Sequence, residues 1–267
     1  MTKNKRAKKK KSTAKRKTAK LQNKRVLLCV ILSAVLFIGI ISGIIAANKT
    51  HKPFVYDFNK SVANGIDVSS HNGKIDWQKA ADEIDFAFIR VGCRGYSDGN
   101  IFLDKRAKRN MRMAGRAGVP YGVYFYSQAI TVEEAEEEAR FLLRHIRNYN
   151  VKLPLVYDFE YAYAKSKPVG RLVHANLSNQ DRTDMINAFC KVVKKAGYSP
   201  ALYASTYVYE SLINVRSLDK DCVIWVADYN PEITYDGYYD IWQASESGSC
   251  RGVSSKNVDI DYWYSRK

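Results

Sequence analysis

The residues best suited to chemistry in this chain are two acids, Asp158 and Glu160, at the end of the apolar segment LPLVYDFE (153–160). Side chains of a β-strand alternate between its two faces, so residues two apart point the same way. At a rise of about 3.3 Å per residue, the backbones of the two acids lie roughly 6.5 Å apart. Carboxyl groups that close repel each other, and one tends to hold its proton. A protonated acid beside an ionised one can cleave a glycosidic bond, although two exposed charges at a strand end would look the same.

This acid pair lies in a chain of alternating strand-like and helical segments. Eight segments are apolar almost throughout, as in parallel strands that are buried on both faces. Strands that alternate with helices predict an α/β fold, and eight strands predict a barrel. Because the connections shorten after the third helix, we expect an irregular, TIM-like β/α barrel in a single domain over residues 64–267. The expected strands are residues 65–69, 86–92, 121–127, 153–160, 200–205, 222–229, 239–245 and 257–263.

Three helices are expected between the early strands, over residues 104–117, 132–147 and 179–196. The second and third follow Thr131 and Ser178, which have acids at the capping-box position three residues later. The second helix also has acids in its first turn and basic residues in its last turn, which suits the helix dipole.

Acids also stand at other expected strand ends. The first and last strands are neighbours in a closed barrel, so Asp67 in GIDVSSHNG and Asp259 in NVDIDYW would face the acid pair across one mouth. Each alone is more commonly a hydrogen-bonded structural aspartate. Asp228 and Asp261 are competing candidates, since both flank strands.

Aromatic residues accompany the acids in the strand segments. The flat C–H faces of sugar rings pack well on aromatic side chains, and Tyr and Trp add polar groups. Ordinary core packing is the alternative for each of them. The long basic and aromatic loop 161–178 is either a variable surface loop or a substrate contact. The aromatic residues are Tyr124, Tyr126, Tyr157, Tyr203, Trp225 and Trp242.

The net charge of +16 is concentrated at one end of the chain. Residues 1–25 hold 13 Lys and Arg and no acid, residues 26–48 hold no charge, and the remainder holds 30 basic and 27 acidic residues. The stretch 26–48 has the length needed to cross a bilayer, so we expect a transmembrane anchor there. By the positive-inside rule, the tail 1–25 would be cytoplasmic and the domain, after a linker at 49–63, would be extracytoplasmic.

Two alternatives to this membrane topology were weighed. A cleaved signal peptide would have a shorter apolar run and an A-x-A site, and the sequence shows neither. The KKKK run at 8–11 could bind nucleic acid, but a membrane-spanning segment directly after the tail favours contact with anionic lipid headgroups. We therefore expect no nucleic-acid partner.

Four cysteines follow the apolar stretch, with spacings that match no zinc pattern. An oxidising compartment would permit disulfides. Cys222 and Cys250 both lie beside late strands and are the pair we expect, whereas Cys190 is expected in a helix core. The four histidines show no ligand spacing, so we expect no metal and no cofactor.

Ordered motifs run from about residue 64 to 263: GIDVSSHNGKIDW, FAFIRVGCRGYSDG, VYDFE, WVADY, IWQAS and NVDID. In this order they resemble glycoside hydrolase family 25, the Chalaropsis-type lysozymes or N-acetylmuramidases. Two positions depart from the resemblance. Phe125 stands where many members have His, and Cys93 stands where an aromatic residue is common.

The resemblance implies hydrolysis of β-1,4 bonds from N-acetylmuramic acid to N-acetylglucosamine in the peptidoglycan of a bacterial wall. Glu160 is the expected general acid, and Asp158 would orient the 2-acetamido group of the substrate. Asp67 and Asp259 would position groups and tune pKa values. The expected substrate-binding residues are Tyr124, Tyr126, Tyr203, Trp225, Trp242 and His71.

Three rival functions remain open from the sequence. A chitinase-like glycosidase would carry a similar pair of acids. A wall-binding module without activity would keep the aromatic residues. The basic tail could itself be the functional part, with a passive outer domain.

Overall fold

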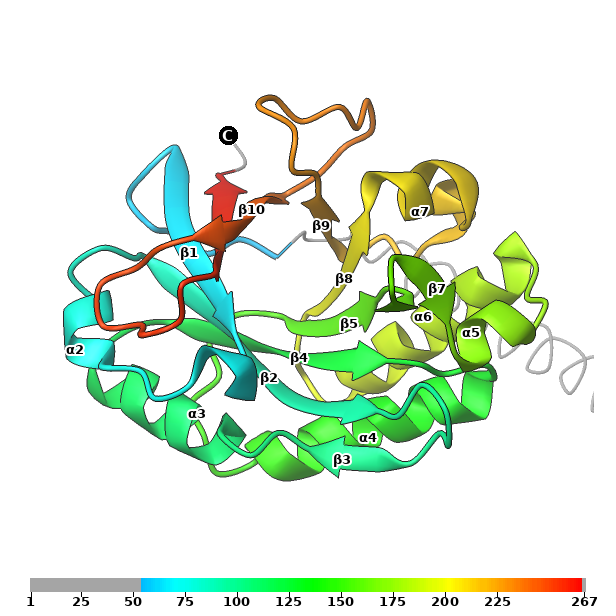
Figure 1. Cartoon of the computed structure of the whole chain (residues 1–267), viewed down its shortest axis with the longest axis horizontal. Helices are drawn as coiled ribbons and strands as arrows, with labels where there is room; N and C mark the ends of the chain where they lie inside the picture. Colours follow the sequence, from blue (N-terminus) through cyan, green and yellow to red (C-terminus); the bar gives the residue numbers. More distant parts are fainter. Residues whose placement is uncertain (1–53, 266–267) are drawn as a thin grey trace, which may run out of the picture. The chain divides into compact units, whose positions relative to one another are not determined.

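Strands and helices alternate from Val62 to Tyr264 in the computed structural model, which describes residues 54–265. Figure 1 shows helices packed around a strongly curved sheet. The strands are β1 (Val62–Val68), β2 (Phe86–Arg94), β3 (Ile101–Leu103), β4 (Tyr121–Ser127), β5 (Leu155–Phe159), β6 (Ala162–Ala164), β7 (Lys167–Val169), β8 (Pro200–Ser205), β9 (Val223–Ala227), β10 (Ile241–Gly248) and β11 (Val258–Tyr264). The helices are η1 (Ser70–Asn72), α2 (Trp77–Ala80), α3 (Ala107–Arg116), α4 (Val132–Ile146), α5 (Arg171–His174), α6 (Asn179–Lys195), α7 (Thr206–Ser211) and η2 (Val215–Ser217).

Eight of the strands close into a barrel in the order β1-β2-β4-β5-β8-β9-β10-β11, with β11 paired back to β1. All eight expected strands are present, so the predicted barrel is confirmed. The expectation that the barrel strands are parallel is wrong for one strand, because β11 runs antiparallel to both β10 and β1. The antiparallel pairing follows from a short connection between β10 and β11, which has no helix to carry the chain back across the barrel.

The helical layer is also uneven. Helices α3, α4 and α6 confirm the three expected helices and cover one side of the barrel. After α6, the structure has only the short α7 and η2 between β8 and β9, and within the described chain no helix follows β9. The barrel is therefore irregular, as the shortening connections predicted.

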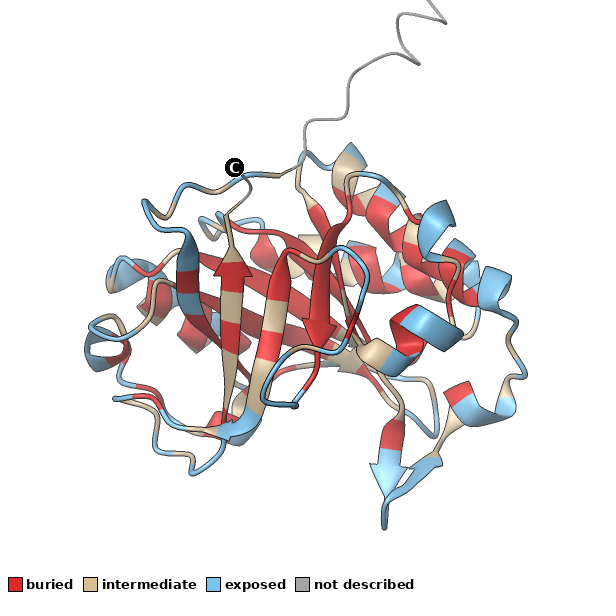
Figure 2. Cartoon of the chain, turned by 90° about the horizontal axis from the view of Figure 1, so that it is seen from above, coloured by how far each residue is buried: buried red, intermediate tan, exposed pale blue. Residues whose placement is uncertain are grey.

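The apolar core has two parts, one between the barrel and the helices and one inside the barrel. Figure 2 shows the strands as the most deeply buried part of the domain. Along each strand the inward positions are apolar near the amino-terminal end of the barrel and polar near its carboxyl-terminal end. Thus Phe88 is followed two residues later by Arg90, and Val156 by Asp158. This change of polarity places the polar side chains together at the carboxyl-terminal end of the barrel.

The chain enters the barrel at the opposite, amino-terminal end. The Phe54 and Phe58 rings both pack on Trp263, with ring centroids 5.9 and 5.5 Å away, and Phe58 also contacts Phe86. Among residues 54–265 no helix is both long and apolar enough to cross a membrane. The anchor expected at residues 26–48 lies outside the described residues.

The cysteine prediction is wrong. The four described cysteines are free thiols, and the Sγ of Cys222 lies 3.8 Å from that of Cys190 rather than pairing with Cys250. Cys190 is buried in α6, as expected for a core residue. Cys222 directly precedes β9 and meets this helix, whereas Cys250 lies in the connection between β10 and β11.

A buried ion pair joins α4 to β2, and we expect its removal to be costly. Arg94 is 4% exposed and its guanidinium binds the fully buried carboxylate of Glu138 at 2.7 Å. Arg94→Ala would leave that carboxyl without its cation, so the free energy of unfolding should fall by about 3–5 kcal/mol. Arg140→Ala, which removes an exposed pair with Glu136, should change it by less than about 1 kcal/mol. Urea denaturation of both variants tests this, and equal effects would contradict it.

Candidate active site

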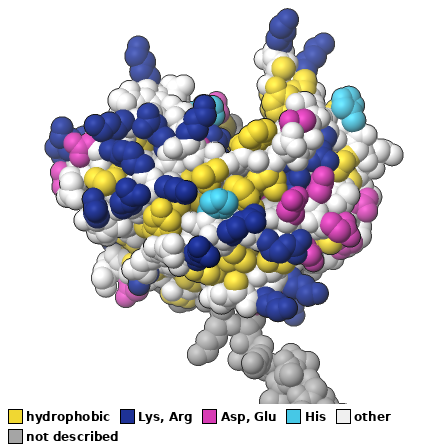
Figure 3. Space-filling view, turned by 90° about the horizontal axis from the view of Figure 1, so that it is seen from below, with side chains coloured by type: hydrophobic (Ala, Val, Ile, Leu, Met, Phe, Trp, Pro, Cys, Tyr) yellow, Lys and Arg dark blue, Asp and Glu magenta, His cyan; other side chains and the backbone are white. Residues whose placement is uncertain are grey.

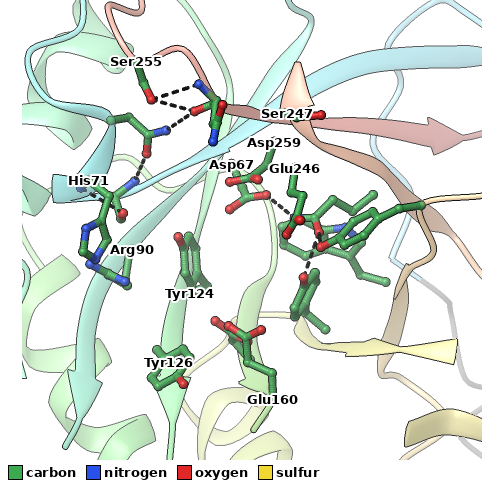
Figure 4. Close-up of a pocket in the computed structure, with 18 residues that line it drawn as sticks. Asp67, His71, Arg90, Tyr124, Tyr126, Glu160, Glu246, Ser247, Ser255 and Asp259 are labelled. Atoms are coloured by element: carbon green, nitrogen blue, oxygen red, sulfur yellow. Dashed lines mark hydrogen bonds between the residues drawn. The ribbon is translucent and has the colours of Figure 1, made fainter. Parts of the chain in front are cut away.

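A hollow of about 550 Å³ opens at the carboxyl-terminal end of the barrel and contains the four predicted acids. Figure 4 shows Asp67, Asp259 and Glu160 directed into it. Asp158 lines it as well. The structure therefore brings together acids that are as much as 190 or so residues apart in the chain.

The first and last strands place Asp67 and Asp259 side by side. The two residues are partners in the antiparallel pairing of β1 with β11, so the expected contact between these strands is confirmed. Asp67 is 6% exposed, and its Oδ2 accepts a hydrogen bond of 2.6 Å from Nε2 of Gln243 on β10. The amide thus fixes the orientation of this carboxyl group.

The acid pair lies at the end of β5. Asp158 faces the barrel interior, while Phe159 between the two acids packs in the outer core, as strand alternation requires. Gln128 donates a 2.8 Å hydrogen bond to the backbone carbonyl of Glu160 and holds the end of the strand. The buried Oδ1 atom of Asp158 has no hydrogen-bond partner within the described residues. A buried oxygen without a partner is costly, so the site itself leaves part of this carboxyl group without a hydrogen-bond donor.

The charges of the hollow favour protonated carboxyl groups. Burial, with Asp259 and then Glu246 as neighbouring negative charges, raises the pKa of Glu160 to about 7, and Arg90 opposes the shift. Burial and Glu246 raise the pKa of Asp259 to about 6. Glu160 thus holds a proton near neutral pH, as a general acid must.

The deeper acids shift in the same direction. Burial first, and then Glu160 and Asp67, raises the pKa of Asp158. Burial and Asp259 do the same for Asp67, against the hydrogen bond from Gln243. Arg90 is the cation of this lining, and its guanidinium is held at 3.0 Å by Asp104. Within residues 54–265 no cluster of His, Cys, Asp and Glu is suited to hold a metal ion.

Most of the predicted aromatic residues also line the hollow. Tyr124, Tyr126, Tyr203 and Trp225 form part of its wall, and exposed His71 in η1 stands at its rim. Trp225 is 1% exposed, and its ring lies 4.9 Å from that of Tyr203 in an edge-on contact.

Trp242 is not in this hollow. Its indole donates a 2.6 Å hydrogen bond to the backbone carbonyl of Asp228, and its ring packs 5.8 Å from Tyr262. Side chains alternate along β10, so Trp242 faces outward because Gln243 faces inward. The competing Asp228 is a structural residue, since its carboxylate accepts hydrogen bonds from Thr206, Thr234 and Asn230, and these hold its pKa well below the ordinary value.

Three important lining residues were missed in the sequence. Oε1 of Gln243 accepts hydrogen bonds from the hydroxyls of Tyr203 and Tyr229, at 2.8 and 2.7 Å, while its amide nitrogen holds Asp67. The sequence could have indicated Arg90, because a charged residue inside an apolar strand is costly to bury unless it has a partner or a role. It could not have indicated Glu246, because this residue reaches the hollow through irregular pairing of β10 with β11.

The loop after Glu160 forms the hairpin β6–β7 and the short helix α5. Tyr161 and Tyr163 of this loop line a second hollow of about 430 Å³, which shares Glu160, Tyr203 and Glu246 with the first. The loop therefore extends the mouth of the barrel beyond the acids.

Comparison with known proteins agrees with this geometry. The profile described as "Glycosyl hydrolases family 25" matches residues 66–253. The uncharacterized protein YegX of Escherichia coli O157:H7 is 26% identical over 210 residues, which are 74% of this chain and 68% of that protein.

Solved structures also share the fold. The modular autolysin LytC of Streptococcus pneumoniae, in complex with a synthetic peptidoglycan ligand, is 29% identical with a TM-score of 0.65, over 76% of this chain and 47% of that one. The match thus spans about half of LytC. A bacterial lysozyme from Streptomyces coelicolor is 23% identical with a TM-score of 0.61, over 75% of this chain and 91% of that one.

An α/β barrel with a cluster of carboxyl groups among tyrosines at its carboxyl-terminal end is typical of a glycoside hydrolase. With the profile covering most of the domain, this chain belongs to glycosyl hydrolases family 25.

Proposed function

We propose that this enzyme hydrolyses the β-1,4 bond between N-acetylmuramic acid and N-acetylglucosamine in peptidoglycan. The observation that carries the proposal is a carboxyl group poised to give up a proton, Glu160, which lines one hollow together with Asp158. Membership of the family and the likeness to an autolysin with a peptidoglycan ligand support this choice of substrate.

In the proposed reaction Glu160 protonates the glycosidic oxygen as its bond to C1 of the muramic acid breaks. The departing sugar leaves as a neutral alcohol, and positive charge develops on the ring that remains. Carboxyl groups around that ring, ionised as the positive charge develops, stabilise this charge better than water does, because they are fixed in a partly buried site.

Asp158 acts on the other side of the scissile bond. Its carboxylate, which lines the hollow, accepts a hydrogen bond from the N–H of the 2-acetamido group, whose carbonyl oxygen then attacks C1. Water opens the resulting ring and returns the proton to Glu160. Asp67 is held in place by Gln243 and pairs with Asp259 across the two strands. These two acids tune the pKa values of the other carboxyl groups.

The activity should fall as the pH rises through about 7, because Glu160 must carry its proton and its pKa is about 7. Asp259→Asn removes the largest charge that raises this pKa, so the decline should move to lower pH. Initial rates on soluble glycan fragments between pH 5 and 9 test both statements. A rate that keeps rising above pH 8 would contradict the assignment of Glu160.

The enzyme is also proposed to be anchored by residues 26–48, with residues 1–25 in the cytoplasm and the barrel outside, facing the wall. The basic tail, the uncharged stretch of membrane-spanning length and the substrate support this topology. Protease added to intact protoplasts should digest the barrel and spare an epitope tag at residue 1. Protection of the barrel would overturn the topology.

The substrate is tested by the chemistry of the new chain ends. The full-length protein in detergent and its Glu160→Gln variant would be incubated with peptidoglycan, and the products reduced with borohydride and analysed by mass spectrometry. Reduced N-acetylmuramic acid that appears only with the unaltered enzyme supports the proposal. Reduced N-acetylglucosamine would indicate a glucosaminidase, and cleavage of chitin instead of peptidoglycan would indicate a chitinase-like enzyme.

A further inference from the structure

A third hollow, of about 590 Å³, lies at the amino-terminal end of the barrel, away from the acids. It is formed by the end of α3, the start of β4, the loop between α4 and β5, and Tyr56. Its charged lining residues are Arg112, Arg116 and Lys152, and no acid lines it. We refer to it as the basic hollow.

The three cations of the basic hollow are exposed and free to bind an anion. Each has its side chain in contact with solvent, and no ion pair or hydrogen bond engages any of them within residues 54–265. Asp57, an exposed acid of the entering segment, does not line the hollow, and its carboxylate accepts the backbone N–H of Asn59. Unpaired cations that line one cavity attract a polyvalent or clustered anion.

Positive charge extends from the basic hollow over the neighbouring helices. Residues 105–132 contain six Lys and Arg and no acid, and residues 139–157 contain four and no acid. Residues 133–138, between these two ranges, contain five acids. Figure 3 shows Lys and Arg side chains over much of the face seen from below, with Asp and Glu side chains gathered at its right. The mouth at the other end of the barrel is lined by five acids and one arginine, so the two hollows differ in the sign of their charged side chains.

The chain enters the domain at the basic end. Phe54 is fixed there by its contact with Trp263, and Tyr56 lines the basic hollow itself. The apolar stretch ends at Asn48, six residues before Phe54. A fully extended chain of that length spans at most about 20 Å. A membrane reached through this stretch would consequently lie close to the basic end of the barrel.

We propose that the basic hollow binds the phosphate headgroups of anionic phospholipids in the membrane that anchors the chain. Arginine matches phosphate oxygens with paired hydrogen bonds, and each cation near an anionic surface contributes attraction. Tyr56 and Tyr149 at the rim suit the boundary between water and lipid. The inference takes the proposed anchor as its starting point, but lipid binding and hydrolysis are measured separately, so either can fail alone.

This contact would orient the enzyme as well as hold it. Docking through the amino-terminal end directs the mouth of the barrel away from the anionic surface, because the two hollows lie at opposite ends of the barrel. The active site then faces the wall rather than the bilayer.

Vesicle binding without the anchor isolates this contact. Both apolar cores lie within residues 54–265, so residues 52–267 form a unit that folds by itself. We expect this unit to sediment with vesicles of phosphatidylcholine and phosphatidylglycerol, and not with phosphatidylcholine alone. Arg112→Gln, Arg116→Gln and Lys152→Gln together should weaken the partition coefficient about a hundredfold, at about 1 kcal/mol per cation.

The matched control removes three exposed lysines near the mouth, two in loops and one at the start of β7, through Lys74→Gln, Lys256→Gln and Lys167→Gln. It lowers the net charge equally and should keep at least half of the binding. Hydrolysis of soluble glycan by the basic-hollow variant reports that it is folded. The proposal would be overturned if both triple variants lost vesicle binding equally. It would also be overturned if binding did not depend on the presence of phosphatidylglycerol. Binding to soluble poly(glycerol phosphate) but not to vesicles would assign the hollow to a wall polymer and also overturn it.

Discussion

Glu160→Gln is expected to lower the rate of hydrolysis by about 10³-fold or more while the barrel stays folded. The amide keeps the shape of the side chain but has no proton to give to the leaving oxygen. No other acid replaces it easily, since Asp158 and Asp67 lie deeper and are fixed by the strands that carry them. Single-turnover rates on a defined glycan fragment measure the loss. Near-normal turnover would refute the role of Glu160.

A stability measurement separates this loss of chemistry from a loss of fold. The pKa of Glu160 is raised to about 7 from an ordinary value of 4.5, so the folded state binds the proton more tightly than the unfolded state. Its stabilising contribution is complete below about pH 4.5 and is lost as the pH rises through about 7. The Gln variant loses no such contribution. It should therefore melt at a higher temperature than the unaltered enzyme at pH 8, and at a similar temperature at pH 4.

A neighbouring carboxylate provides the control for Glu160. Glu246 lines the same hollow and also raises the pKa of Glu160, but it comes from the β10–β11 wall. Glu246→Gln should therefore change the rate by less than about tenfold, through the pKa of Glu160. Similar losses in both variants would show that total negative charge, rather than one proton donor, is what the reaction needs.

Asp158→Asn is the second change with a large expected effect, a loss of about 10²–10³ in rate. The amide is the same size, but it cannot stabilise the positive charge that develops when the acetamido oxygen attacks. A thiazoline analogue of the cyclised N-acetyl sugar should bind the unaltered enzyme and bind the variant at least tenfold more weakly. Unchanged affinity for the analogue would exclude this role for Asp158.

The matched control for this variant is Asp228→Asn. Asp228 is also an aspartate at a strand end, but its carboxylate is occupied by Thr206, Thr234 and Asn230. Its replacement should lower the free energy of unfolding and affect the rate less than Asp158→Asn does. The comparison separates an aspartate that supports the fold from one proposed to act on substrate.

The sequence predicted the eight barrel strands because each is an apolar run too short for a helix and bounded by turn residues. Closure of the barrel alone predicted that the first strand pairs with the last. The same pairing predicted that Asp67 and Asp259 lie side by side. The position of Glu160 and Asp158 on one face followed from the two-residue period of a strand. These parts of the site depend only on local geometry and ring closure.

Other parts depended on contacts that a single sequence does not display. The two-residue alternation of VDIDYWY reads the same in either direction, so the antiparallel β11 could not be foreseen. In IWQAS either Trp242 or Gln243 faces the barrel interior, and the structure has Gln243 there, which the sequence pattern alone does not decide. Cys222 meets Cys190 because of how α6 packs on the barrel, which their separation in the chain does not reveal.

Closure of the barrel by its two terminal strands also has a consequence for how the enzyme is made. Asp259 lies on β11 and pairs with a strand made about 190 residues earlier. Such distant pairing is slow, and here it cannot begin until β11 has left the ribosome. A chain that stops before β11 has an open ring without Asp259 and Trp263, so the hydrolase gains activity only after β11 has been made.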